Sequence, residues 1–221
     1  MQIQNQQNQD EGRLLLIDKP LEWTSFDVVN KLRRILNTKK IGHAGTLDPL
    51  ATGLLIICVG KMTKQIEKFM GLEKEYTGTF VIGRTTPSHD LETPVSEEAD
   101  YSAITNETIA TAARSLTGSI SQLPPMHSAI RVGGKRAYAF ARKGKEVELQ
   151  PRNVEVSTFE ITGIRLPEVD FRIVCSKGTY IRSIARDFGT TLGVGAYLSS
   201  LRRTRIGQYR IEDALTLDMV S

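Results

Sequence analysis

The sequence is poor in the residues that build covalent or metal frameworks. It has two cysteines, Cys58 and Cys175, and neither belongs to a C-x-x-C pair or has a histidine beside it. This speaks against both a disulfide framework and a metal site. Each cysteine lies in an apolar stretch typical of a strand, so we expect buried free thiols in a reducing cytoplasmic compartment.

Long hydrophobic runs and targeting segments are also missing. No stretch approaches the roughly 18 apolar residues that suggest a membrane helix, so we expect no membrane partner. Residues 1–12 are rich in Gln and Asn and have no apolar centre, unlike a signal or transit peptide. We expect them to form a disordered tail, followed by one folded domain over residues 13–221.

The fingerprints of nucleotide cofactors are absent too. Gly60 and Lys61 invite comparison with a phosphate-binding P-loop, but six residues separate Gly53 from Gly60 and Met62 follows the lysine. The P-loop requires a shorter spacing and a Ser or Thr after the lysine. We therefore expect chemistry carried out by side chains alone, without a cofactor.

Charge is low overall but strongly segregated. The net charge is +4, yet residues 131–145 carry six cations and no acid, and 202–210 carry four cations and no acid. Residues 31–40 add five cations, whereas 88–107 hold six acids and no base. A single basic run is ordinarily a solvated surface, but three together favour RNA or DNA as a partner.

Local patterns predict strands and helices in mixed order. Thr24 and Asp27 have the spacing of a capping box at a helix start, and the continuous apolar run 54–59 predicts a buried central strand. No regular strand–helix–strand rhythm is present, so we expect an α+β domain with a largely antiparallel sheet flanked by helices and loops. Other strands are expected at 14–18, 76–82, 153–164, 169–176 and 195–211, and other helices at 63–70, 107–117, 135–143 and 179–192.

Residues 42–53, G-H-A-G-T-L-D-P-L-A-T-G, form a glycine-bearing loop directly before the apolar strand. His43 and Asp48 lie in this loop, and Pro49 fixes the backbone after the carboxylate. Loops carried by a rigid strand often hold catalytic groups. An aspartate in a turn also commonly bonds local amides, and spacing alone favours that second interpretation.

The sequence of this loop resembles the signature of the TruB family of tRNA pseudouridine synthases. The resemblance continues in the same order through nearly the whole chain, and it implies the pseudouridine synthase fold for residues 13–221. It also implies an isomerase that breaks the C1′–N1 bond of the T-loop uridine, position 55 of tRNA, and rejoins the base through C5. The further matching segments are D-K-P at 18–20, K-E-Y-T at 74–77, G-K-R-A-Y-A-F-A-R-K-G at 134–144, C-S-K-G-T-Y-I-R-S at 175–183 and L-R-R-T-R-I-G at 201–207.

The resemblance implies that Asp48 is the essential carboxylate. It can act as a nucleophile on the ribose or base, or as a base at the sugar, and the residues do not choose between these routes. Arg182 resembles the arginine that pairs with this aspartate and favours its ionised form. Without the resemblance, we would interpret Arg182 as a surface helix arginine.

Four further residues match positions that contact the substrate. Tyr76 resembles the tyrosine that stacks on the target base and takes the C5 proton, although a core aromatic would also fit a strand. His43 resembles a histidine that holds the flipped-out loop by shape and stacking. Tyr180 and Leu201 match positions that line the uridine pocket.

Segment 124–150 resembles the family's RNA-clamping insertion, with His127 where a tyrosine is common. Six phosphate contacts by its cations would give a slope of log K against log salt of roughly −4 to −5. We expect no C-terminal PUA domain, and this absence together with the clamp argues against the guide-dependent dyskerin type. We expect a monomer that binds the T-arm of tRNA without a guide RNA. The expected RNA-binding residues are Arg131, Lys135, Arg136, Arg142, Lys143, Arg202 and Arg203.

Two other functions remain open at this point. A non-catalytic tRNA-binding or tRNA-folding module predicts that Asp48→Asn leaves all function intact. A metal-dependent nuclease using His43 and Asp48 predicts strand cleavage that a chelator abolishes. One histidine and one carboxylate without further ligands nearby make a poor metal site.

Overall fold

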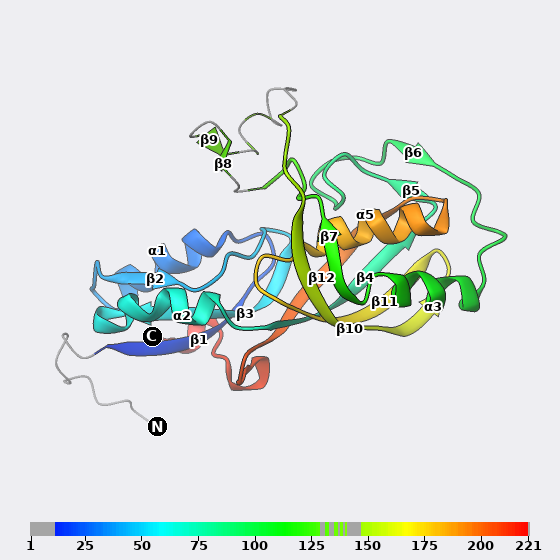
Figure 1. The fold of residues 1–221 in the computed structure, drawn as a ribbon. Coiled ribbons are helices and arrows are strands. Elements are labelled where there is room, and N and C mark those ends of the chain that lie inside the picture. Colours follow the sequence, from blue (N-terminus) through cyan, green and yellow to red (C-terminus); the bar gives the residue numbers. More distant parts are fainter. Residues whose placement is uncertain are drawn as a thin grey trace. The chain divides into compact units, whose positions relative to one another are not determined.

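A computed structural model describes residues 12–128, 131–132, 135–136, 138, 140 and 147–220. The described chain divides into two compact units, one formed up to Tyr76 and from Arg202 onward, the other formed by Thr77–Leu201. Two strands, β4 (Lys74–Ile82) and β12 (Ala196–Ile206), contribute residues to both units (Figure 1). Both units combine helices with a sheet, which confirms the predicted α+β class.

The first unit is built around strand β3. Strand β1 pairs antiparallel with β3 from Arg13↔Val59 to Lys19↔Gly53, and β2 also pairs antiparallel with it. The order continues from β3 to β12, and β13 pairs with β12. The elements of this unit besides β4 and β12 are β1 (Arg13–Lys19), α1 (Ser25–Ile35), β2 (Ile41–His43), β3 (Ala51–Val59), η1 (Gly60–Gln65), α2 (Ile66–Met70), β13 (Tyr209–Arg210), η2 (Ile211–Asp213) and η3 (Leu217–Val220).

Strand β3 is buried on both faces, as its continuous apolar run predicts. Leu55 and Ile57 pack with α1, β1 and Leu217, whereas Leu54, Ile56 and Cys58 pack with α2 and Ile206. Successive side chains of a strand point to opposite faces, so the two sets belong to two separate hydrophobic clusters. The strand is thus a rigid support for the loop that precedes it.

Helix α1 begins where the sequence predicts. The Thr24 hydroxyl accepts a hydrogen bond from the Asp27 amide at 3.0 Å, and the Asp27 carboxylate accepts from the Thr24 amide at 2.9 Å. This is the expected capping box, which satisfies two amides that have no partner within the helix. The first residue of the helix, Ser25, is thereby fixed in place.

The second unit carries its strands in the order β12-β4-β11-β10-β7. Strand β10 pairs antiparallel with both β11 and β7. Four phenylalanines form the aromatic core, and Phe80 stacks on Phe171 with ring centroids 4.1 Å apart. The other elements are β5 (Arg84–Thr85), β6 (Glu97–Glu98), α3 (Asn106–Ser115), β7 (Gly118–Gln122), β8 (Arg131–Val132), β9 (Lys135–Arg136), β10 (Arg152–Arg165), β11 (Glu168–Cys175) and α5 (Ile181–Leu192).

Some expectations are confirmed and others are wrong. Both cysteines are buried free thiols. The expected helix at 135–143 is wrong at its start, because residues 135–136 form strand β9, paired with β8. The loop of 42–53 is shorter than expected, because backbone pairing with β3 draws Gly42 and His43 into β2. No helix in the described part of the chain is long and apolar enough to cross a membrane.

Several expectations lie largely outside the described residues. The predicted tail is described only at Gly12. Within the expected clamp, Arg142 and Lys143 lie outside the described residues, and only the backbone of Arg131, Lys135 and Arg136 is described. RNA binding by these five residues therefore stays a prediction.

Candidate active site

Asp48 lies in the loop of residues 44–50 that joins β2 to β3. The amide of Ala51 donates to the Asp48 carbonyl oxygen at 3.0 Å, and the amide of Ala44 donates to the Ile56 carbonyl at 2.9 Å. These bonds fix both ends of the loop to β3. Asp48 is half-buried, so it is neither enclosed in the core nor fully in solvent.

The residue before Asp48 is held by the start of α1. The Ser25 hydroxyl donates to the Leu47 carbonyl at 3.2 Å and accepts from the Leu47 amide at 2.9 Å. Both residues are buried. One hydroxyl therefore satisfies both main-chain groups of Leu47, which would otherwise be buried without a partner.

A buried lysine holds the residue after Asp48. The Lys19 ammonium donates to the carbonyl oxygens of Pro20 at 2.9 Å, Trp23 at 2.6 Å and Pro49 at 3.3 Å. An ammonium has three N–H donors, and these contacts employ all of them. Lys19 thus ties the end of β1 to the Asp48 loop from within the core.

The electrostatics of Lys19 reflect this burial. Desolvation lowers the pKa of Lys19 to about 8, opposed by attraction to the Asp48 carboxylate and assisted by repulsion from Arg203. The attraction acts on both groups, so the ammonium also favours a negatively charged Asp48. The first unit therefore supplies Asp48 with a nearby cation of its own.

Arg203 supports the other side of the loop, which corrects its predicted role. It is 1% exposed, and its guanidinium donates from Nε to the Leu54 carbonyl at 2.7 Å and from Nη2 to the Gly45 carbonyl at 3.1 Å. A guanidinium so enclosed is not available to an RNA phosphate. The prediction that Arg203 binds RNA is therefore wrong, and we assign the residue to holding the loop.

Close packing around Arg203 requires glycine on the facing strand. Gly53 has a φ of +101°, and a Cβ atom there would lie 2.3 Å from the Arg203 carbonyl oxygen. The neighbouring Arg202 is exposed by comparison and forms an ion pair with Asp18 at 2.7 Å. Arg202 therefore keeps its place among the candidate RNA-binding residues.

His43 stands at the end of β2, where the loop begins. Burial lowers the pKa of His43, and the charge of Arg203 lowers it further. The imidazole is therefore neutral at physiological pH. A neutral ring suits stacking on a base better than pairing with a phosphate, in line with the role that the sequence implies.

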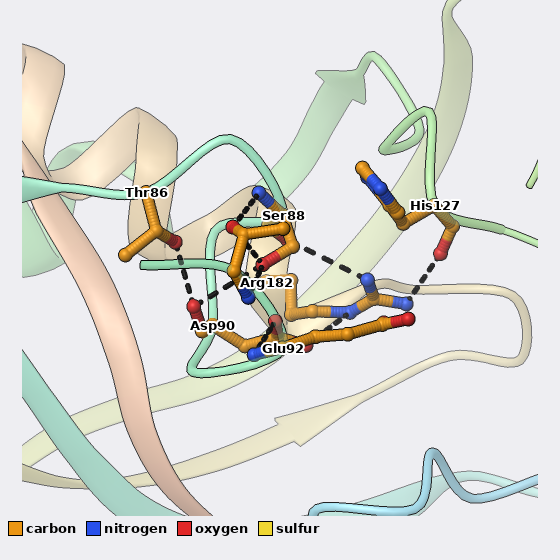
Figure 2. A network of polar contacts seen from close by, with 7 residues as sticks. Thr86, Ser88, Asp90, Glu92, His127 and Arg182 are labelled. Atoms are coloured by element: carbon orange, nitrogen blue, oxygen red, sulfur yellow. Dashed lines mark hydrogen bonds and ion pairs between the residues drawn. The ribbon is translucent and has the colours of Figure 1, made fainter. Parts of the chain in front are cut away.

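In the second unit, Arg182 is the centre of a buried polar network (Figure 2). Its guanidinium donates to the His127 carbonyl at 2.8 Å and to the Ser88 carbonyl at 3.5 Å, and Nε lies 3.5 Å from an Asp90 carboxylate oxygen. Arg182 is 3% exposed, so the interpretation as a surface helix arginine is wrong. Helix α5 directs this side chain inward.

The loop that carries Asp90 is itself fixed by hydroxyl groups. Thr86 and Ser88 donate to the Asp90 carbonyl at 2.7 and 3.2 Å, and the Glu92 amide donates to its carboxylate at 2.9 Å (Figure 2). Neither Ser88 nor Asp90 was predicted to be a site residue. Their only sequence signal is polar residues within an acidic connection, which does not reveal an inward-facing loop.

Two histidines adjoin this network. His127 contributes its carbonyl oxygen to Arg182, so the tyrosine-to-histidine departure at this position does not remove the contact. His89 has a φ of 61° in the left-handed region. Burial and the charges of Arg186 and Arg182 lower the pKa of His89 to about 4, which leaves its ring uncharged at neutral pH.

The structure places the remaining candidates on defined elements. Tyr76 is a buried residue of β4 in the first unit, 8% exposed, and belongs to the same unit as Asp48 and His43. Tyr180 is the N-cap residue of α5, and Leu201 lies in β12, both in the second unit with Arg182.

A cavity of about 460 Å³ opens on the first unit, but we do not assign the uridine to it. Its lining includes Asp18, Trp23, Lys31 and Arg202, and Asp48 is not among its residues. Among the described residues, no three histidine, cysteine or carboxylate side chains gather as metal ligands would.

Comparison with solved structures shows which fold this chain has. The chain resembles a solved pseudouridylate synthase with a TM-score of 0.51 and 17% identity, covering 94% of this chain and 69% of that one. It also resembles an archaeal box H/ACA Nop10–Cbf5 complex, with a TM-score of 0.70, 27% identity and 96% coverage of this chain. A Cbf5–Nop10–Gar1 complex gives a TM-score of 0.71 at 30% identity over 93% of this chain. This chain spans about half the length of the matched chains in those two complexes, 53% and 52%.

Comparison of the sequence with protein families and with individual relatives identifies the family. The model of the TruB family pseudouridylate synthase N-terminal domain matches residues 33–181, and the tRNA pseudouridylate synthase B C-terminal domain model matches residues 182–221. The chain is 52% identical to tRNA pseudouridine synthase B of Flavobacterium johnsoniae over 95% of this chain and 94% of that protein. The protein of the same name from Phocaeicola vulgatus is 51% identical over 96% of this chain and 92% of that protein. The chain therefore belongs to the TruB family of pseudouridylate synthases, and it is an isomerase.

Proposed function

We propose that this protein isomerises the T-loop uridine at position 55 of tRNA to pseudouridine, with Asp48 as the catalytic carboxylate. The observation that carries the proposal is the Asp48 loop, in which a partly accessible carboxylate stands on a backbone fixed at Leu47, Pro49 and Ala51. The curated relatives named tRNA pseudouridine synthase B, matched over almost their full length, supply the substrate class.

The reaction needs one group that can attack the sugar or the base, or take a proton from the sugar, while positive charge develops at C1′. An ionised Asp48 suits this need as nucleophile or as base at the sugar. The C1′–N1 bond breaks, the base turns, the C1′–C5 bond forms, and the C5 proton passes to solvent while N1 gains one. A loop that is already fixed avoids the cost of ordering the carboxylate during the reaction.

The remaining candidates would bind and orient the uridine. Tyr76 would stack on the everted base and accept the C5 proton, and His43 would hold the opened loop. Tyr180 and Leu201 would line the pocket, and Arg182 would orient Asp48 and favour its ionised form. The buried network around Arg182 supports this role, because an arginine fixed on carbonyl oxygens presents its remaining donors in one direction.

The partner would be the T-arm of tRNA, bound by a monomer without a guide RNA. The basic segment 131–145 would lie along the phosphate backbone. The identity of 52% and 51% to proteins named tRNA pseudouridine synthase B, over 94% and 92% of their lengths, supports this proposal over the guide-dependent type.

The test uses unmodified tRNA that carries tritium at the uridine C5 positions. We expect the wild-type protein to release tritium and Asp48→Asn to lose the rate by at least about 10³-fold, the scale of a lost catalytic group. Mapping the product should place pseudouridine at position 55. Absence of tritium release by the wild-type protein would instead favour a binding or folding module, full release by Asp48→Asn would reject Asp48 as the catalytic carboxylate, and chelator-sensitive strand cleavage would favour a nuclease.

A further inference from the structure

The start of helix α5 is held from outside by a buried glutamine on β7. Gln122 is fully buried, and its side-chain amide both accepts from the Tyr180 amide at 2.8 Å and donates to the Tyr180 carbonyl at 3.2 Å. The two residues are far apart in the sequence, so this is a tertiary clamp on one main-chain unit. Tyr180 caps α5 without a side-chain hydrogen bond of its own, so Gln122 is its anchor.

The ring of the same tyrosine is covered by an arginine on β10. The guanidinium carbon of Arg152 lies 4.8 Å from the centre of the Tyr180 ring, and its Nη2 donates to the Gly178 carbonyl. Stacking of a guanidinium on an aromatic face fixes the ring plane. Gln122 therefore sets the backbone of Tyr180, and Arg152 sets its side chain.

These two anchors are paired with each other. Arg152 and Gln122 are direct partners in the antiparallel ladder of β10 and β7 (Figure 1). They stand where the chain enters and leaves the segment 124–150. Three further side chains of α5 bind the chain that follows β7. Ser183 and Arg186 donate to the Leu123 carbonyl at 2.8 and 3.1 Å, and Arg182 donates to the His127 carbonyl.

We propose that Gln122 and Arg152 are positioning residues that fix Tyr180, and through the first turn of α5 also Arg182, in the geometry that the isomerisation requires. The inference rests on the proposed function, in which Tyr180 and Arg182 contact the uridine and Asp48. Neither Gln122 nor Arg152 touches the reacting atoms.

The test compares matched variants by single-turnover tritium release at saturating tRNA and by tRNA affinity. Gln122→Met keeps the length and removes both hydrogen bonds, and Gln65→Met makes the same change at an exposed position outside the candidate site and the basic segments. We expect Gln122→Met to lower the rate about 10- to 100-fold, the scale of a small misplacement of pocket groups. Its tRNA dissociation constant should stay within about threefold, and Gln65→Met should stay within about twofold in both quantities.

A double-mutant cycle provides an independent readout, should Gln122→Met fail to fold. Arg152→Met should lower the rate in the wild-type background and lose most of its effect in a Tyr180→Leu background, whereas the exposed Arg165→Met should do neither. Equal rates for Gln122→Met and Gln65→Met, a loss confined to tRNA affinity, or additive effects in the cycle would overturn the inference. An active Asp48→Asn would instead reject the proposed function, so the two failures are distinguishable.

Discussion

The two units both contain buried cations that donate hydrogen bonds to main-chain carbonyl oxygens, but the cations have different roles. The Asp48 loop belongs to the first unit and Arg182 to the second. In the first unit the cations, Lys19 and Arg203, are the support, and the functional side chain stands on the backbone that they hold. In the second unit the functional side chain is itself the cation, and carbonyl oxygens hold it. Changes to Lys19 and Arg203 should therefore act mainly through stability and loop geometry, and changes around Arg182 should act directly on catalysis.

The largest expected effect on stability is at Arg203. Arg203→Met leaves the buried carbonyls of Leu54 and Gly45 without their donor, which should lower the free energy of unfolding by about 3 kcal/mol. Arg202→Met removes a partly exposed ion pair with Asp18 and should cost about 1 kcal/mol or less. Urea denaturation of both variants measures the difference, and equal losses would contradict the assignment of Arg203 to loop support.

The network in the second unit can be tested at Asp90. Asp90→Asn keeps the shape but removes the charge that faces Arg182, so the guanidinium keeps its carbonyl contacts and loses the ion pair that helps to orient it. We expect the single-turnover rate to fall at least about tenfold, as expected when a group that orients a pocket residue is lost. Asp100→Asn, an exposed acid-to-amide change in the same unit, is the control and should keep the wild-type rate. A normal rate for Asp90→Asn would show that Arg182 does not need this partner.

Lys19 makes the first unit sensitive to alkaline pH. At pH 7 the lysine is protonated in both folded and unfolded protein, so folding bears the full cost of burying the charge. Between the folded pKa of about 8 and the unfolded pKa near 10.5, the unfolded chain binds more protons, so stability should rise with pH. The free energy of unfolding of wild type, relative to Lys19→Met, should therefore increase from pH 8 to pH 10. A constant difference over this range would mean that the pKa of Lys19 is not lowered.

The smallest expected effects are at the two helix caps, which form a matched pair. Thr24→Ala in α1 and Thr105→Ala in α3 each remove a capping box and should cost about 1 kcal/mol. Only α1 holds the Asp48 loop, through Ser25. We therefore expect Thr24→Ala to lower the rate of tritium release by a fewfold and Thr105→Ala to leave it unchanged. Equal rates for the two variants would mean that the capping box of α1 does not affect the geometry of the Asp48 loop.

The elements with local signals could be predicted from the sequence. The capping box at Thr24 predicted α1, and the apolar run 54–59 predicted β3, which is buried on both faces. Alternation over residues 169–176 announced β11. These features depend on neighbours in the chain, so the sequence contains all the information that they need.

The supports of the site could not be predicted, because they depend on contacts between distant residues. No residue near Lys19 in the sequence indicates that its ammonium donates to the Pro49 carbonyl. The run R-R-T-R likewise does not indicate that Arg203 is the buried arginine. Gln122 and Asp90 were missed for the same reason, since a lone amide or carboxylate carries no sign of its partner. The proposed roles of Asp48, Tyr76 and Arg182 came from resemblance to a family, because no local pattern reveals them.

The anchors of the Asp48 loop have a consequence for how this segment can vary. Lys19 and Arg203 contact main-chain oxygens at Pro49, Gly45 and Leu54, and every amino acid carries such an oxygen. Side chains around the carboxylate could therefore be exchanged to reshape the substrate pocket while the loop keeps its course. Positions 45 and 53 are exceptions, because Gly45 and Gly53 have φ angles of +98° and +101°, and a Cβ atom at Gly53 would also collide with the Arg203 backbone. An engineer who wishes to alter which nucleoside is accepted could vary the exposed positions of the loop, provided that both glycines and the buried Leu47 stay.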